Sequence, residues 1–168
     1  MAIREIMTEG ESCLAKQCHP VTKFDKKLHD LLDDMAETLE EAEGVGLAAP
    51  QVGILRRVVI VIDENDEIIE LINPEIVKTE GEQEGLEGCL SIPGKYGIVK
   101  RPMVVRVRAQ DRDGEWFEVE DEGLTARCFC HELEHLDGHL FNEHIDRYLT
   151  EAELRAFYEA QEDGEENK

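Results

Sequence analysis

The sequence predicts an α+β fold, with antiparallel β-sheets around a central helix and one further helix near each end of the chain. Apolar residues recur at helical spacing in only three stretches, and β-branched runs fill the sequence between them in adjacent pairs. Because the helical stretches do not alternate with single strands, this pattern favours α+β over a doubly wound parallel sheet. A chain of 168 residues suits one domain, which we place at 1–168.

The first helix is expected after a loop-like segment, Met1 to Val21. Thr22, with Asp25 three residues later, has the pattern of a capping box at a helix start. The apolar residues that follow repeat at helical spacing, which predicts an amphipathic helix that ends at Gly44. These residues are Phe24, Leu28, Leu31, Leu32, Met35 and Leu39.

A glycine-rich segment, Gly44 to Gly53, is expected to turn the chain toward the first strand. Its two glycines around Val45 permit a close backbone approach, and Gln51 offers an amide that both donates and accepts hydrogen bonds. The segment lacks the Lys and the Ser or Thr of a phosphate-binding loop. Alone, it predicts only a turn.

The first hairpin is predicted from two β-branched runs, Arg57 to Ile62 and Ile68 to Ile72, on either side of an acidic turn at 63–66. Asn73-Pro74 is then expected to turn the chain into a separate strand near Glu75 to Thr79. Together these runs indicate an antiparallel meander.

A second hairpin pairs Met103 to Asp111 with Trp116 to Glu120 across Asp113-Gly114. Thr150 and Glu153 form another capping-box pattern, ahead of a last amphipathic helix. Its apolar residues are Leu154, Phe157 and Tyr158. We expect the acidic tail, residues 162–168, to fray.

The central helix is predicted at 124–138, where the sequence reads His131-Glu132-Leu133-Glu134-His135, an H-E-x-x-H pattern. Positions i and i+4 lie on one helix face, so both imidazoles can reach a single metal ion. Glu132 lies beside them and can act on metal-bound water. Glu134 is interpreted as a solvent-facing helix residue.

A catalytic centre of this kind usually has a third protein ligand, for which the sequence offers two kinds of residue. A carboxylate from Glu151, Glu153 or Glu159 would make the chain a metalloprotease. The thiolate of Cys89 is a stronger ligand for zinc or iron and lies in a glycine-containing stretch. A non-catalytic zinc-binding module that uses Cys89, Cys128, Cys130 and histidines is the third alternative.

Three segments in the same order, Gly44 to Gln51, Glu87 to Ser91 and His131 to His135, resemble the three motifs of the peptide deformylase family. The resemblance covers roughly residues 1–160. It implies a metal-dependent amide hydrolase that removes the N-formyl group from the N-terminal formyl-methionine of newly synthesised proteins and releases formate. It also favours Cys89 as the third ligand.

The resemblance implies a role for each matching residue. Cys89, His131 and His135 would hold one divalent ion, with Fe(II) expected in the cell and Zn, Ni or Co in purified protein. Glu132 would carry protons, while the Gln51 side chain and the Leu90 backbone N–H would stabilise the oxyanion. The remaining residues would align the peptide or line a methionine pocket, and these are Val45, Gly46, Leu90, Leu124, Cys128 and His131.

Two residues on the central helix, Arg127 and Cys130, depart from the aliphatic residue and Gln often found in the family. Their effect is expected on the shape of the pocket and on the hydrogen bonds around the ligands, because neither position belongs to the three motifs. The chemistry of the metal site should be unaffected.

The composition limits the partners and the compartment. Eighteen basic and 40 acidic residues give a net charge of −22, so we expect no direct binding to nucleic acid or to an anionic membrane. Five cysteines at irregular spacing agree with reduced thiols, and no apolar run approaches the ~18 residues of a spanning helix, which predicts a cytoplasmic protein. The expected partners are N-formyl-Met peptides and nascent chains, with transient ribosome association; the acidic carboxyl end offers little attraction to ribosomal RNA.

Overall fold

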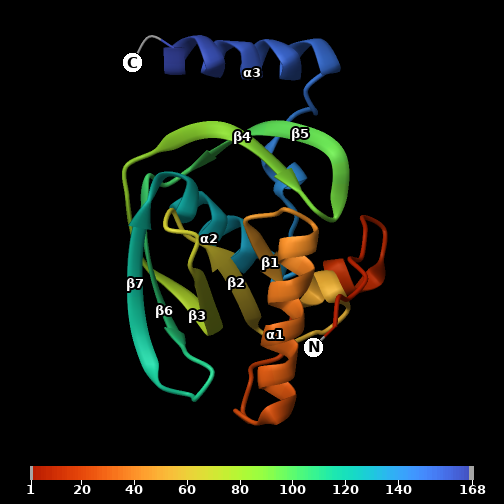
Figure 1. Ribbon diagram of the computed structural model, residues 1–168, viewed down its shortest axis with the longest axis vertical. Coiled ribbons are helices and arrows are strands. Elements are labelled where there is room, and N and C mark those ends of the chain that lie inside the picture. The colour runs from red at the N-terminus through yellow and green to blue at the C-terminus, as the bar shows by residue number, and fades with distance from the viewer. Residues whose placement is uncertain (1, 167–168) are drawn as a thin grey trace.

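The computed structural model describes residues 2–166 and is built around a five-stranded antiparallel sheet (Figure 1). The strand order is β1-β2-β3-β6-β7, and every neighbouring pair is antiparallel. The strands are β1 (Gly46–Ala48), β2 (Val58–Ile62), β3 (Ile68–Glu80), β6 (Val104–Gln110) and β7 (Trp116–Glu122). Separate helices pack against this sheet, which confirms the predicted α+β class.

The two faces of the sheet are covered by different helices. On one face lies α1 (Lys26–Glu41), and on the other lies α2 (Gly123–His135). Val58 belongs to the apolar cluster around α1, and its neighbour Val59 to the cluster around α2, because successive side chains of a strand point to opposite faces. The continuous apolar run of β2 therefore reflects burial on both sides.

A second sheet consists of only two strands, β4 (Gln83–Cys89) and β5 (Ile92–Arg101). Figure 1 shows this hairpin beyond α2, on the side of the helix away from the larger sheet. The sequence analysis predicted no strand between residues 80 and 102, so this element was missed. Its importance is positional, because β4 ends at Cys89 and brings this residue toward α2.

The ends of α1 differ from the prediction. Asp25, and not Thr22, is the N-cap, since its carboxylate accepts the Leu28 N–H at 3.1 Å. The helix ends at Glu41, and the left-handed residue that follows is Glu43 with φ of 55°, so the expected end at Gly44 was wrong. Asp25 is the better cap because it lies three residues before an amide that needs an acceptor.

Asn73-Pro74 does not separate two strands as predicted. β3 runs through both residues with a register shift between Ile72 and Glu75, and Asn73 takes a φ of 51°. The Asn73 side chain holds the distortion in place by accepting the Val21 N–H at 2.8 Å and donating to the Val21 carbonyl at 2.9 Å. The Asn73-Pro74 pair, which predicted a turn, therefore marks a β-bulge inside one strand.

The remaining elements largely follow the sequence. Both hairpins pair as predicted, β2 with β3 and β6 with β7. The first segment is mostly irregular with one short 3₁₀ helix, Ser12–Ala15, and Met1 lies outside the described residues. The expected turn at 44–53 contains β1 and a second 3₁₀ helix, Ala49–Val52.

A third 3₁₀ helix, Phe141–His144, precedes the last helix, α3 (Glu151–Glu166). The predicted capping box of α3 is present, because Thr150 and Glu153 each accept the other's backbone N–H at 3.1 Å. The acidic segment expected to fray continues the helix as far as Glu166, and residues 167–168 lie outside the described part. None of the described helices is long and apolar enough to span a membrane.

Gly53 and Gly138 have the same backbone conformation but different surroundings, so a comparison of the two tests how tightly the chain packs around Gly138, after α2. Gly53 and Gly138 both have φ of 81°, but an added Cβ would meet nothing within 4 Å at Gly53, and at Gly138 it would lie 2.7 Å from the Ala15 carbonyl. We expect Gly53→Ala to lower the free energy of unfolding by about 1–2 kcal/mol, which is the left-handed strain alone. Gly138→Ala should lower the free energy of unfolding by about 1–3 kcal/mol more, because the added Cβ overpacks this site. Urea denaturation of both variants measures the difference, and equal losses would contradict the proposed clash.

Candidate metal centre

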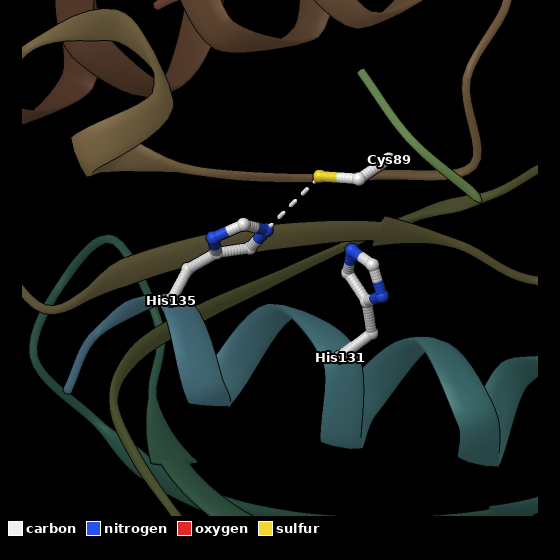
Figure 2. A group of neighbouring side chains, drawn as sticks. All are labelled: Cys89, His131 and His135. Carbon is white, nitrogen blue, oxygen red and sulfur yellow. Dashed lines mark hydrogen bonds between the residues drawn. The ribbon is translucent and has the colours of Figure 1, made fainter. Parts of the chain in front are cut away.

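The two histidines of the H-E-x-x-H pattern lie on the face of α2 that meets the β4–β5 hairpin (Figure 2). Both are buried, with His131 8% and His135 1% exposed. They are held there because the adjacent stripe of α2, which includes Phe129 and Leu133, packs against the larger sheet. The rotation of the helix is therefore fixed by its apolar side, and the imidazoles are left facing the hairpin.

Cys89 completes a group of three ligand atoms. Its Sγ lies 3.4 Å from His135 Nε2, and the ligand atoms of Cys89, His131 and His135 all lie within 4.8 Å of one another. A thiolate and two imidazoles are a donor set for zinc, iron and related ions, whereas Mg and Ca require oxygen. The residues therefore fit a divalent transition metal.

The electrostatics of the two imidazoles agree with a cation between them. Burial and the nearby His131 hold the pKa of His135 well below its ordinary value, so this ring is neutral, the form that binds metals. Burial also acts to lower the pKa of His131, but hydrogen bonds to Cys89 and Glu87 outweigh it and raise that pKa to about 10. The acceptors around this ring, Cys89 and Glu87, together with the nearby Glu132, therefore make its surroundings negative, which favours a bound cation.

The alternative ligands from the sequence analysis do not join this group. Within residues 2–166, neither Cys128 nor Cys130 lies in a metal-binding cluster, and burial raises their pKa values to about 12 and about 11. Glu153, in α3, pairs instead with Arg147 in the segment that precedes this helix, and neither it, Glu151 nor Glu159 joins the metal-binding group of the described residues. These placements remove the support for a distal-glutamate protease and for a cysteine-rich zinc module.

Glu132 lies beside the ligands without being one of them. Its Oε1 is 3.6 Å from His131 Nε2, while its Oε2 is buried and has no hydrogen-bond partner among the described residues. Burial raises the pKa of Glu132 to about 7. Gly46 of β1 makes this position possible, because a Cβ there would lie 2.8 Å from Glu132 Cγ. A carboxyl group with this pKa can exchange protons near neutrality.

Gln51 reaches the same centre from the 3₁₀ helix Ala49–Val52, and Leu90 lines the cavity in front of it. Gln51 is 1% exposed, and its Oε1 accepts the Ala48 N–H at 2.9 Å, which orients the amide. Its Nε2 then faces Ser91 Oγ at 3.1 Å and Cys89 Sγ at 3.6 Å. A fixed donor is therefore present at the metal centre, next to the Cys89-Leu90 peptide.

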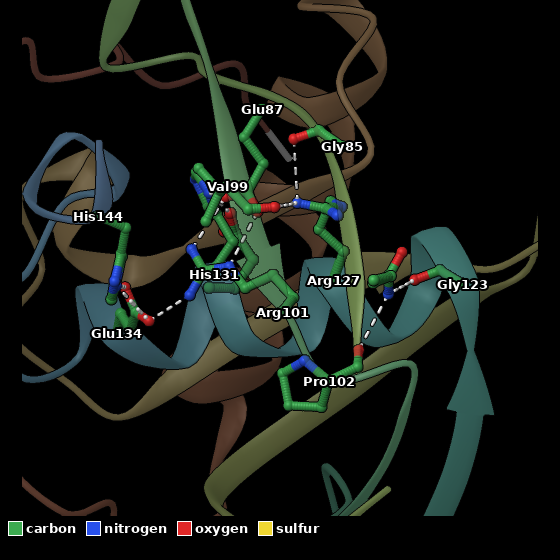
Figure 3. A network of polar contacts seen from close by, with 12 residues as sticks. Gly85, Glu87, Val99, Arg101, Pro102, Gly123, Arg127, His131, Glu134 and His144 are labelled. Carbon is green, nitrogen blue, oxygen red and sulfur yellow. Dashed lines mark hydrogen bonds and ion pairs between the residues drawn. The ribbon is translucent and has the colours of Figure 1, made fainter. Parts of the chain in front are cut away.

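The sequence analysis gave no role to Glu87, which is the main support of the centre (Figure 3). Its Oε1 lies 2.9 Å from His131 Nδ1, an arrangement that leaves Nε2 of this ring for the metal. Arg101 binds the same carboxylate through Nε and Nη2, each at 2.9 Å. Burial alone would raise the pKa of Glu87, but the bonds from Arg101 and His131 hold it well below its ordinary range. Glu87 is therefore an ionised and fully engaged acceptor.

Glu134 was expected to face solvent, and this interpretation was wrong. Its side chain is only 25% exposed and forms an ion pair with Arg101. His144 Nε2 lies 2.8 Å from the other carboxylate oxygen. The 3₁₀ helix that carries His144 also places Phe141 against His131, with ring centroids 5.9 Å apart. These contacts depend on chain segments that no local pattern connects to α2.

A cavity of about 390 Å³ opens in front of the centre. All the residues predicted to bind substrate line it, and these are Val45, Gly46, Leu90, Leu124, Cys128 and His131. Val45 is 45% and Leu124 61% exposed, so both lie at the rim. Arg127, one of the two departures, also lines the cavity, whereas Cys130 lies elsewhere on the helix.

A buried carboxylate next to a site for a transition metal, in front of an open apolar cavity, places the chain in the class of metal-dependent hydrolases. Comparisons with known proteins specify the class further. Residues 3–151 match the model of the family described as polypeptide deformylase. The chain belongs to this peptide deformylase family, and it is therefore an enzyme that hydrolyses the N-formyl group of N-terminal methionine in newly synthesised proteins.

The relatives are similar over nearly their whole length. A peptide deformylase of Agathobacter rectalis is 55% identical over 89% of this chain and 94% of its own, and one of Caldicellulosiruptor bescii is 52% identical over 92% of each. The crystal structure of a peptide deformylase from Legionella pneumophila has a TM-score of 0.82 at 41% identity, covering 95% of this chain and 98% of that one. The crystal structure of a peptide deformylase from Thermotoga maritima has a TM-score of 0.83 at 39% identity, covering 87% of this chain and 99% of that one.

The role of Glu87 can be tested by a change that preserves its shape. Glu87→Gln replaces an ionised acceptor with an amide, so His131 loses part of the bond that orients it. We expect metal affinity to fall by roughly 10- to 100-fold, the usual cost of changing a group that supports a ligand. Glu84→Gln, on the exposed side of the same strand, is the control and should bind metal normally. The measurement is a chelator competition, and wild-type affinity in Glu87→Gln would show that His131 is oriented by other contacts.

Proposed function

We propose that formate release takes place at one centre in which Cys89, His131 and His135 hold the metal and Glu132 carries the protons. The observation that carries this proposal is the convergence of the three ligand atoms within 4.8 Å at the end of the cavity. A divalent cation bound there would supply Lewis acidity toward water and the formyl carbonyl. The other steps belong to the chain itself.

Glu132 is assigned two proton transfers. It accepts a proton from the attacking water as the new C–O bond forms, and it delivers that proton to the amine nitrogen as the C–N bond breaks. Formic acid and a free α-amine are the products of these steps, and formate results when the acid releases its remaining proton to water, so atoms and charge balance. The pKa of about 7 that burial gives Glu132 suits both directions of transfer near neutral pH.

Gln51 and Leu90 are assigned to the charge that develops on the formyl oxygen. The Gln51 amide is held in place by the Ala48 N–H, so its donor needs little reorganisation during the reaction. The backbone N–H of Leu90 would be the second donor. The main chain at Val45 and Gly46 would align the peptide along β1, and the cavity would take the methionine side chain.

The metal in the cell is proposed to be Fe(II). The ligand set accepts Zn, Ni and Co as well, so the donor atoms alone do not select iron. The family resemblance favours ferrous iron, and a thiolate next to an open position explains why such a centre would be sensitive to oxygen.

The partners are proposed to be N-formyl-Met peptides and nascent chains in the cytoplasm. Transient ribosome association would use a surface other than α3. Exposed acidic side chains on this helix, among them Glu151, Glu159 and Glu162, would repel RNA, and a net charge of −22 argues against nucleic-acid binding in general.

Two substitutions separate the proton carrier from the ligands. Glu132→Gln should keep the metal and lose most of its turnover, roughly 100-fold or more, because general acid–base catalysis contributes 10²–10⁴. Cys89→Ala should lose both metal and turnover. Formate release from a formyl-Met peptide is measured beside metal content by atomic absorption. Loss of metal in Glu132→Gln would make this residue a ligand and overturn the assignment.

The identity of the metal is tested by reconstitution. Anaerobically prepared Fe, Ni and Zn forms are assayed before and after exposure to air. We expect the Fe form to be the most active and to lose activity in air, while the Ni form remains stable as long as Cys89 is not oxidised. A Zn form as active as the Fe form, with neither sensitive to oxygen, would contradict the ferrous assignment and leave the three-ligand site intact.

A further inference from the structure

The ion pair between Glu134 and Arg101 lies behind the metal centre, and no step of the proposed reaction uses it. Arg101 directs Nε and Nη2 at Glu87, and its Nη1 binds Glu134. The Arg101 side chain is only 4% exposed, so water has little access to these nitrogens. A buried guanidinium nitrogen without an acceptor is costly, and Glu134 supplies the acceptor for Nη1.

The same acceptor constrains the plane of the guanidinium. The nitrogens of an arginine are held in one rigid plane, so a partner at Nη1 limits how Nε and Nη2 can meet Glu87. Nη2 of Arg101 shares Glu87 Oε1 with Nδ1 of His131, and both distances are 2.9 Å. A tilt of Arg101 would therefore disturb the oxygen atom that orients this metal ligand.

His144 holds the Glu134 carboxylate in turn. Its Nε2 lies 2.9 Å from Oε1 and 2.8 Å from Oε2 of Glu134. Because an ionised carboxylate only accepts hydrogen bonds, this nitrogen carries the proton and donates it. The His144 side chain is 42% exposed, so the network begins at the protein surface. From there it passes through Glu134, Arg101 and Glu87 to His131, as Figure 3 shows.

The 3₁₀ helix Phe141–His144 thus reaches the ligand His131 by two routes. Phe141 stacks on the imidazole with an angle of 24° between the ring planes, which is a direct contact. His144 reaches it only through the polar network. Polar support of this kind fixes the orientation of a ligating imidazole, and changing it commonly weakens metal binding. The outer members of the network can therefore influence the centre without touching it.

We infer that Glu134 and His144 are positioning residues for the metal ligand His131. They act in series, through Arg101 and Glu87. Neither belongs to the group of three ligands, and neither lines the cavity in front of it. Their role is to keep the Arg101 guanidinium in the plane in which Glu87 accepts two of its N–H groups. The inference rests on the proposed function of the three-ligand centre.

A double-mutant cycle tests whether Glu134 acts through Glu87. Chelator competition gives the Co(II) affinity of Glu134→Gln in the wild-type background and in Glu87→Gln. We expect a loss of roughly three- to tenfold in the wild-type background, less than for Glu87→Gln because the changed residue is further from the metal. In Glu87→Gln the same change should cost about twofold or less, since the residue through which it acts is already altered. The visible spectrum of the Co(II) form should also change in Glu134→Gln, because its bands report the ligand geometry, which a merely structural role would not alter.

His144 offers a second pair of variants at the surface, which carries the test even where Glu134→Gln fails to fold. His144→Leu removes the donor and should lower the Co(II) affinity by about two- to threefold, whereas His144→Gln keeps a donor and should restore it. His139→Leu is the matched control. The His139 side chain is 55% exposed and pairs with Glu143, outside the network, so this variant should bind Co(II) normally.

Wild-type affinity in either Glu134→Gln or His144→Leu overturns the inference. An equal loss for Glu134→Gln in the two backgrounds also overturns it, because this residue would then act by another route, such as the adjacent ligand His135. Formate release by the wild type still supports the proposed function in both cases. A wild-type protein that neither binds Co(II) nor releases formate from a formyl-Met peptide overturns the proposed function itself, and the inference with it.

Discussion

The carboxylate of Glu87 is the interaction on which the site depends. Two guanidinium groups and the imidazole of His131 bind its two oxygens, and these partners come from α2 and from β5. A buried carboxylate needs this many donors, because removing one charged partner from such a network commonly costs 3–5 kcal/mol. The network therefore does more than orient one ligand. It ties the small hairpin to the helix, and in this way it fixes where β4 ends and where Cys89 is placed.

The larger sheet contributes the second constraint. α2 cannot rotate without removing Phe129 and Leu133 from a packed core, so its opposite face is determined by hydrophobic burial. The polar residues on that face are then kept in a low-dielectric environment, where His135 stays neutral and the pKa of Glu132 rises to about 7. The reactivity of the centre thus follows from the same packing that fixes its geometry.

Much of the site could be predicted from sequence because its residues occur in short local patterns. The H-E-x-x-H spacing is sufficient to place His131 and His135 on one helix face. The β4–β5 hairpin gave no such signal, since glycines and charges interrupt it. Gly88, for example, weakens the strand pattern, yet it is required because a Cβ there would lie 2.5 Å from the Tyr96 ring across the hairpin. Without the hairpin, the partners of Glu87 could not be found from sequence.

Arg127 shows how one side chain of α2 can serve two parts of the site. An aliphatic residue at this position could line a cavity, but it could not bind a carboxylate. In this chain the same side chain borders the cavity and bonds to Glu87, which in turn orients His131. The shape of the pocket and the orientation of a metal ligand are therefore coupled through one guanidinium group.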